Sequence, residues 1–147
     1  MEVTGLKPLL LRSPRASPYA STVRLADKNT AYAYEELQNK RTIHAKELFQ
    51  KALESDPLNV DAAVNLGVVE AQSGNAEKAL SLWKSALERA PWNPAIGLNI
   101  AQLSCSLGYI EEAKTYVKRV LQYNPDHSQA NSLLNQLQSQ ATLCNSQ

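Results

Sequence analysis

Hydrophobic and small residues repeat along this chain with a period of 34 residues. Three prolines, Pro57, Pro91 and Pro125, mark the period, and the residues before each proline repeat in the same register. The matched sets are Ala52, Ala86 and Val120; Phe49, Trp83 and Val117; and Ala45, Ala79 and Ala113. A repeat of this length is typical of helical arrays, in which each unit buries its apolar face only against its neighbours.

Each unit is predicted to hold two helices. In the middle unit, apolar residues follow helical spacing over 60–73 and over 76–89, and Gly74 with Asn75 makes the turn. Pro91 ends the second of these helices, because proline cannot continue a helix.

The outer units follow the same plan. The third unit begins at Asn93 and Pro94, which form an N-cap and first-turn pair, and it turns at Gly108. The first unit carries Lys40 and Arg41 at its turn in place of glycine, so the sequence leaves the geometry of this turn open.

The pattern predicts an all-α protein, a right-handed α-α superhelix of seven helices that forms a helical repeat solenoid. The expected divisions are an arm or linker (1–25), three repeats (26–59, 60–93 and 94–127), a closing helix (128–141) and a tail (142–147).

Small and large residues at matched positions indicate where the helices approach each other. Gly67, Ala79 and Ala113 are expected where a larger side chain would push two helices apart. Phe49 and Trp83 are expected to fill the space between helices.

In this register, the middle unit resembles the tetratricopeptide repeat, whose pattern ends with the same spacing of alanine, aromatic residue and proline. The resemblance covers 26–127 as three repeats, and 128–141 resembles the polar helix that closes such arrays. In the first helix of the first unit, Asn29, Tyr32 and Ala33 depart from the pattern. The residues that carry the resemblance are Ala63, Leu66, Gly67, Ala79, Trp83, Ala86 and Pro91.

The resemblance implies a scaffold or adaptor that binds a peptide or a partner protein in a concave groove lined by the first helix of each unit. An asparagine amide both donates and accepts, so Asn65 and Asn99, one period apart, can hold an extended backbone with little regard for its sequence. Alternatively, these asparagines bond neighbouring helices, and both roles stay open. The expected groove residues are Tyr34, Asp61, Val64, Asn65, Val68, Gln72, Leu98, Asn99 and Gln102.

Similar arrays that hold the acidic carboxyl terminus of heat-shock chaperones use lysines, an arginine and asparagines. The corresponding positions here are Thr30, Tyr34, Asn65, Ala95 and Asn99, and one of the five keeps the expected residue. Without fixed positive charge a terminal carboxylate is poorly compensated, so we expect no binding of chaperone tails.

Prolines Pro8, Pro14 and Pro18 make a continuous helix improbable before about Ser21. Residues 1–25 suit a plain linker, the scar of a longer chain, an arm that covers part of the groove, or a transit segment. The apolar run 9–11 is too short for a secretory signal, and no transmembrane segment is expected. The compartment therefore stays open, cytoplasmic by default and periplasmic if the chain belongs to a larger exported protein.

Composition and motifs favour a non-catalytic protein without a cofactor or metal. The net charge is +1, and basic residues are interspersed with acidic ones, so no stripe for nucleic acid is expected. His44 and His127 are expected in solvated or capping roles, and the pair Glu35 and Glu36 as solvated surface.

Further residues bear on the chemistry. Cys105 and Cys144 lack metal-ligand spacing and are expected as small apolar side chains, not as a disulfide framework. Trp92, between the second and third units, either packs onto the preceding helix end or is an exposed anchor for a partner.

A second interpretation belongs to a different class. The chain would be the C-terminal array of a larger exported enzyme that resembles multihaem cytochromes, with the catalytic part absent here. Continuous coding sequence upstream of Met1, especially with Cys-x-x-Cys-His motifs, would favour this interpretation.

Overall fold

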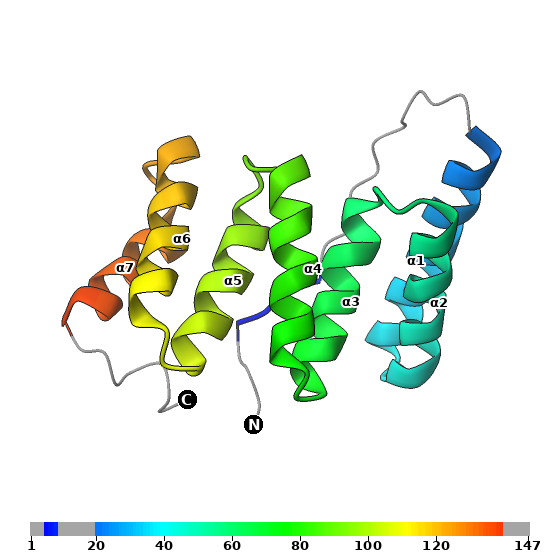
Figure 1. Cartoon of the computed structure of the whole chain (residues 1–147), viewed down its shortest axis with the longest axis horizontal. Helices are drawn as coiled ribbons and strands as arrows, with labels where there is room; N and C mark the ends of the chain where they lie inside the picture. Colours follow the sequence, from blue (N-terminus) through cyan, green and yellow to red (C-terminus); the bar gives the residue numbers. More distant parts are fainter. Residues whose placement is uncertain (1–4, 9–19, 140–147) are drawn as a thin grey trace.

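A computed structural model describes residues 5–8 and 20–139 of the chain. In this part the chain forms helices and no strand, which confirms the all-α helical repeat solenoid (Figure 1). The helices are α1 (Ala20–Gln38), α2 (Thr42–Ser55), α3 (Val60–Gln72), α4 (Ala76–Arg89), α5 (Pro94–Ser106), α6 (Ile110–Tyr123) and α7 (Ser128–Ser139).

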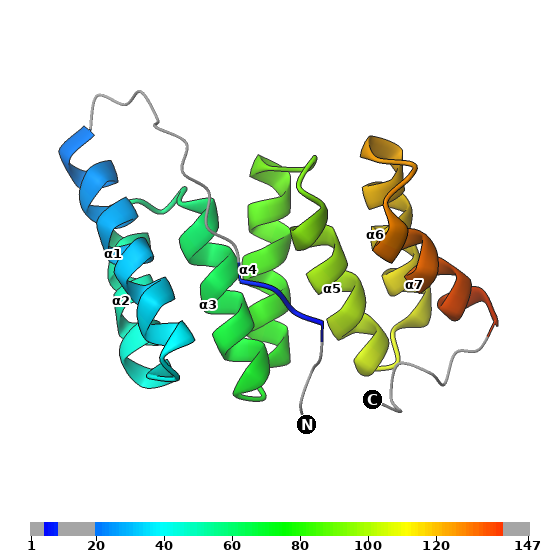
Figure 2. The same cartoon turned by 180° about the vertical axis from the view of Figure 1, so that it is seen from behind.

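The helices pack as consecutive antiparallel pairs. Helices α1 and α2, α3 and α4, and α5 and α6 form the pairs, and α7 packs on α6. Figure 2 shows α1, α3, α5 and α7 in one layer, with α2, α4 and α6 in the layer behind. The first helix of every unit therefore lies on the same side of the array, as the repeat predicts.

The three turns inside the units have the same backbone structure. Gly74 and Gly108 adopt the left-handed conformation, with φ of 88° and 85°, and Lys40 adopts it at the equivalent place with φ of 61°. In each turn this residue donates to the carbonyl three residues earlier, and the next residue donates to the carbonyl five residues earlier, a Schellman ending. The turn of the first unit therefore has the same backbone structure as the other two, with Lys40 at the position that glycine occupies in them.

Capping residues also follow the 34-residue period. Asn59 accepts a hydrogen bond from the Ala62 amide at 2.9 Å, and Asn93 accepts one from the Ala95 amide at 3.0 Å. The predicted cap at Asn93 and Pro94 is confirmed. His127 starts α7 in the same way, because its Nδ1 lies 3.3 Å from the Ala130 amide nitrogen, which confirms its expected capping role.

The core confirms the register of small and large residues. Trp83 is fully buried, and its indole lies against Gly67, where an added Cβ would overlap the ring. Phe49, Ala79 and Ala113 are also fully buried. Glycine at position 67 is what allows α3 and α4 to close around the tryptophan.

Three local expectations are corrected. Helix α1 begins at Ala20, ahead of the expected boundary at residue 26, because neither proline nor glycine interrupts the chain after Pro18. Glu36 is buried and paired, not solvated surface. Cys105 is buried as expected but is disulfide-bonded, which spacing along the chain does not reveal. Cys144 and most of residues 1–25 lie outside the described residues.

Candidate functional site: the α3/α5 face

The predicted groove residues come mainly from α3 and α5, and we call the side of the array that these helices form the α3/α5 face. Five of the nine predicted residues are buried there, Tyr34, Asp61 and Gln102 are partly exposed, and Gln72 is exposed. Tyr34 lies on α1, which makes few contacts with α3. The buried five are Val64, Asn65, Val68, Leu98 and Asn99.

A short N-terminal segment, residues 5–8, lies on this face, and we call it the arm. Figure 2 shows the arm running from α3 to α5, in front of α4. Leu6 packs against the buried cluster that includes Val64 and Val68. Of the interpretations for residues 1–25, this placement agrees with an arm that covers part of the groove.

Asn99 holds the backbone of the arm through both ends of its side-chain amide. The Lys7 amide nitrogen donates to Asn99 Oδ1 at 3.3 Å. In return, Asn99 Nδ2 donates to the Lys7 carbonyl oxygen at 3.4 Å. Asn99 thus bonds both backbone groups of a single residue of the arm, while its predicted contact with a partner segment stays a prediction.

Next to Asn99, the side chain of Gln102 borders the arm at Gly5. A Cβ added at Gly5 would stand 2.7 Å from Gln102 Nε2, and Gly5 has a φ of 82°. The backbone conformation favours glycine at this position, whereas the end of the Gln102 side chain can move aside. The other predicted asparagine, Asn65, is fully buried on α3.

Glu70, a buried carboxylate on α3, is the centre of a network that the sequence reasoning missed. Glu70 is fully buried, and its Oε1 lies 2.9 Å from Lys46 Nζ of α2 and 3.0 Å from Lys78 Nζ of α4. Asn75 Nδ2 donates to Glu70 Oε2 at 2.6 Å. Burial raises the pKa of Glu70, but the hydrogen bonds from Lys46, Asn75 and Lys78 outweigh it and lower the pKa to about 2.

One period earlier, Glu36 repeats this arrangement. Its carboxylate lies 2.8 Å from His44 Nδ1 and 3.3 Å from Arg41 Nη1. The hydrogen bond from His44 lowers the pKa of Glu36. The signal was available in the sequence, because Glu36 and His44 precede Glu70 and Lys78 by the same 34 residues.

Charged side chains that line a pocket beside α4 and α6 make contacts within the array. This pocket has a volume of about 540 Å³. Among its lining residues, Lys84 pairs with Glu112 at 2.6 Å, and the Arg119 guanidinium lies 5.0 Å from the centre of the Tyr116 ring. The Lys84–Glu112 pair joins α4 of the second unit to α6 of the third, and the Arg119–Tyr116 contact lies within α6.

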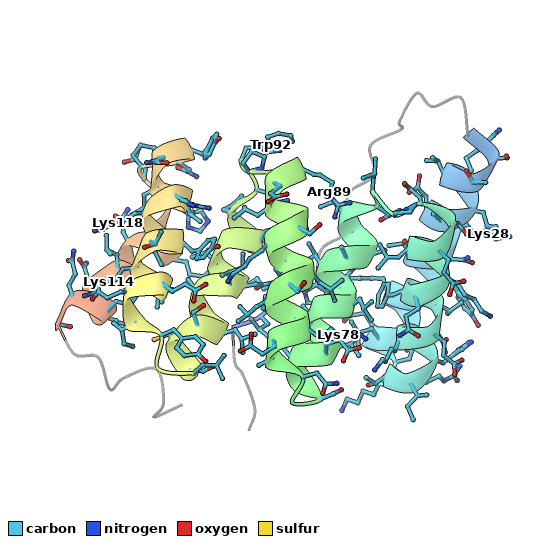
Figure 3. The ribbon with its side chains drawn as sticks, in the orientation of Figure 1. Lys28, Lys78, Arg89, Trp92, Lys114 and Lys118 are labelled. Atoms are coloured by element: carbon cyan, nitrogen blue, oxygen red, sulfur yellow. The ribbon has the colours of Figure 1, made fainter. Side chains whose placement is uncertain are left out.

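Trp92 stands on the loop between α4 and α5, and Figure 3 places it at the edge of the array where α4 ends, near the middle of the array's length. Its side chain is 63% exposed.

Among the described residues, no three or more histidine, cysteine, aspartate or glutamate side chains form a group that could hold a metal ion. No helix among them has the length and apolar character needed to cross a membrane.

Comparison with known protein families gives a consistent result. Two family models described as tetratricopeptide repeat match the chain, one over residues 30–94 and the other over residues 70–137. Together they span 30–137, which includes the α3/α5 face. A search of curated proteins finds no match.

Solved structures share the fold. The first tetratricopeptide repeat domain of Spaghetti (RPAP3), bound to the HSP90 peptide SRMEEVD, has a TM-score of 0.73 and 18% identity, over 79% of this chain and 92% of that one. A tetratricopeptide repeat protein from Parabacteroides merdae has a TM-score of 0.72 and 26% identity, over 83% and 50%. The O-GlcNAc transferase of Thermobaculum terrenum has a TM-score of 0.69 and 21% identity, over 84% and 23%.

Proposed function

The chain belongs to the tetratricopeptide repeat family, and from this premise we propose that it is a non-catalytic scaffold that binds an extended partner segment on its α3/α5 face. The arrays of this family bury their apolar faces between neighbouring units and leave an extended surface for a partner. Among the structural neighbours, the Spaghetti domain is bound to a peptide, which supports the same kind of ligand here.

The pairing of Asn99 with the backbone of Lys7 is the observation that carries this proposal. An amide that bonds both the N–H and the C=O of one residue recognises extended backbone, whatever side chain that residue has. Leu6 of the arm packs against the buried cluster that includes Val64 and Val68, and an apolar side chain of a partner segment would pack at the same place.

The residues of this face argue against an acidic chaperone tail as the ligand. Ala95 and Asn99 stand where clamps of that kind have cationic side chains, and Thr30 turns its hydroxyl to the Ala26 carbonyl at 2.8 Å within α1. A terminal carboxylate would find no fixed positive charge at these positions. The proposed ligand is therefore an internal extended segment.

The distribution of basic residues favours a protein partner over nucleic acid. Figure 3 shows Lys28 near one end of the array and Lys114 and Lys118 near the other, with Lys78 between them. Lys78 and Lys114 are paired with carboxylates. A continuous basic stripe is what phosphate recognition requires, and paired, scattered lysines do not supply it.

The second interpretation, a module of a larger exported enzyme that resembles multihaem cytochromes, stays a prediction. The O-GlcNAc transferase shows that an array of this fold occurs inside a much longer enzyme, because the chain spans 23% of it. The coding sequence upstream of Met1 tests this interpretation.

An affinity pull-down from the lysate of the source cell tests the proposed function. The intact chain is compared with the Asn65→Ala, Asn99→Ala double variant, and circular dichroism confirms that both are folded. Asn135→Ala, an exposed asparagine on α7, is the matched control. We expect a protein that binds the intact chain and the control but not the double variant. Equal recovery by all three chains would contradict recognition through this face.

A further inference from the structure

We propose that residues 5–8 are an intramolecular ligand of the α3/α5 face, which a partner's extended segment must displace. The proposal rests on the proposed function for the role of this face. It adds that the face is closed in the isolated chain, and that the arm shows which sequence pattern the face accepts.

Three contacts along the arm hold it in place. Asn99 bonds the backbone of Lys7 on both sides, as a partner strand would be held. Leu6 packs against the buried cluster formed by α3, α4 and α5. Gly5 lies against Gln102. The arm therefore uses the same groups that the proposed function assigns to a partner segment.

The side chains of the arm define the chemistry of a competing segment. Lys7 is exposed, so the residue held by Asn99 can have any side chain but needs an N–H, which excludes proline. The residue before it is apolar, because Leu6 packs against the core. The residue before that is glycine, because Gly5 has a φ of 82°, which residues with a Cβ rarely adopt. The expected partner presents glycine, an apolar residue and any residue except proline, in that order.

The covalent connection makes the arm an effective competitor. A short tether gives the arm an effective concentration on the order of 1 mM at the face. If the arm sequence, as a free peptide, binds the face with a dissociation constant of about 0.1 mM, the tethered arm weakens the binding of any external segment about tenfold. Removing the arm from the face should restore that affinity without any change in the helices.

Hydrogen exchange at the Lys7 amide tests whether the arm occupies the face. In the full chain we expect this amide to exchange more slowly than in a free peptide of residues 1–12. Asn99→Ala should return the exchange rate to that of the peptide. The control Asn135→Ala should leave the protection unchanged.

A binding measurement tests the competition. The probe is a fluorescent peptide with the sequence of residues 1–12, added to full-length chains and followed by anisotropy. Leu6→Asp should bind the probe about tenfold more tightly than the intact chain, because its own arm no longer packs. Lys7→Ala keeps the backbone groups and should behave as the intact chain. Adding Asn99→Ala to Leu6→Asp should abolish the gain.

The outcomes separate this inference from the proposed function. Unprotected exchange at Lys7, or a probe that binds the intact and Leu6→Asp chains equally or binds neither, overturns the inference. The pull-down then still decides the proposed function. Conversely, protected exchange and a tenfold gain in probe binding support the inference even if the pull-down recovers no partner.

Discussion

The indole nitrogen of Trp83 donates a hydrogen bond to the backbone carbonyl of Val64 at 2.9 Å, and both residues are fully buried. This bond joins α4 to α3 at the point where Gly67 leaves room for the ring. It gives the large aromatic side chain of the middle unit a polar partner as well as an apolar surrounding.

Replacing Trp83 by alanine should destabilise the array by about 3–5 kcal/mol, because it removes the largest buried side chain and leaves a cavity. Urea denaturation followed by circular dichroism measures the loss. Trp83→Phe should cost less, because it keeps an aromatic ring and loses chiefly the hydrogen bond. A Trp83→Ala chain as stable as the wild type would contradict the assigned register of the repeats.

The fold was predictable because the 34-residue period appears in the sequence at several independent positions. Trp83, Ala79 and Pro91 fix the middle unit, and Asn93 identifies the start of the third unit. The boundary of α1 was not predictable to the residue, because alanine, serine and threonine before residue 26 tolerate both helix and loop.

The candidate site was predictable only in part. Asn99 could be recognised from its place on the first helix of its unit, and in the structure its side chain bonds the backbone of Lys7 in the arm. The contact itself joins residues 92 positions apart, and no local pattern encodes a meeting at that distance. The roles of Glu36 and Glu70 were missed because carboxylates in helices are mostly solvated. Comparing the two units would have shown the matched donors.

Lys40→Gly should stabilise the array by about 1 kcal/mol. Lys40 has a φ of 61°, and a residue with a Cβ pays about 1–2 kcal/mol in this conformation, more than the entropy that glycine loses on folding. Thermal denaturation measures the gain as a higher Tm. Lys40→Ala, which keeps the Cβ, is the control and should give no such gain. Equal stability of both variants would indicate that the turn bears no strain.

Glu70→Gln should destabilise the array by about 1–3 kcal/mol at pH 7, because it removes the charge that Lys46 and Lys78 face. The pKa of Glu70 is lowered from 4.5 to about 2 in the folded chain. Its contribution to stability is therefore present above pH 4.5 and is lost as the pH falls toward 2.

The stability difference between the wild type and Glu70→Gln isolates this contribution from that of other carboxylates. Urea denaturation at a series of pH values should show the difference shrinking between pH 4.5 and 2. A difference that stays constant over this range would mean that the charge of Glu70 contributes nothing to stability.

An acidic peptide that ends in a free carboxylate should not bind the chain with micromolar affinity. The positions expected to hold cationic side chains include Ala95 and Asn99, which offer no charge to the carboxylate. Isothermal titration calorimetry measures the affinity, and Leu6→Asp should be titrated as well, so that the arm does not mask binding. Micromolar or tighter binding to either chain would contradict the prediction.

Trp92→Ala should leave the Tm within the range of ordinary surface substitutions while weakening the binding of a partner that contacts the loop between α4 and α5. With 63% of its side chain exposed, Trp92 contributes little to folding, and surface substitutions usually change stability by less than about 0.5 kcal/mol. An exposed tryptophan that serves as an anchor contributes about 2 kcal/mol or more to an interface, which corresponds to a loss of affinity of at least about thirtyfold. Thermal denaturation and a repeat of the pull-down with this variant measure the two effects. A clear fall in Tm with partner binding retained would instead show that Trp92 packs onto the end of α4, and that its exposed face serves no partner.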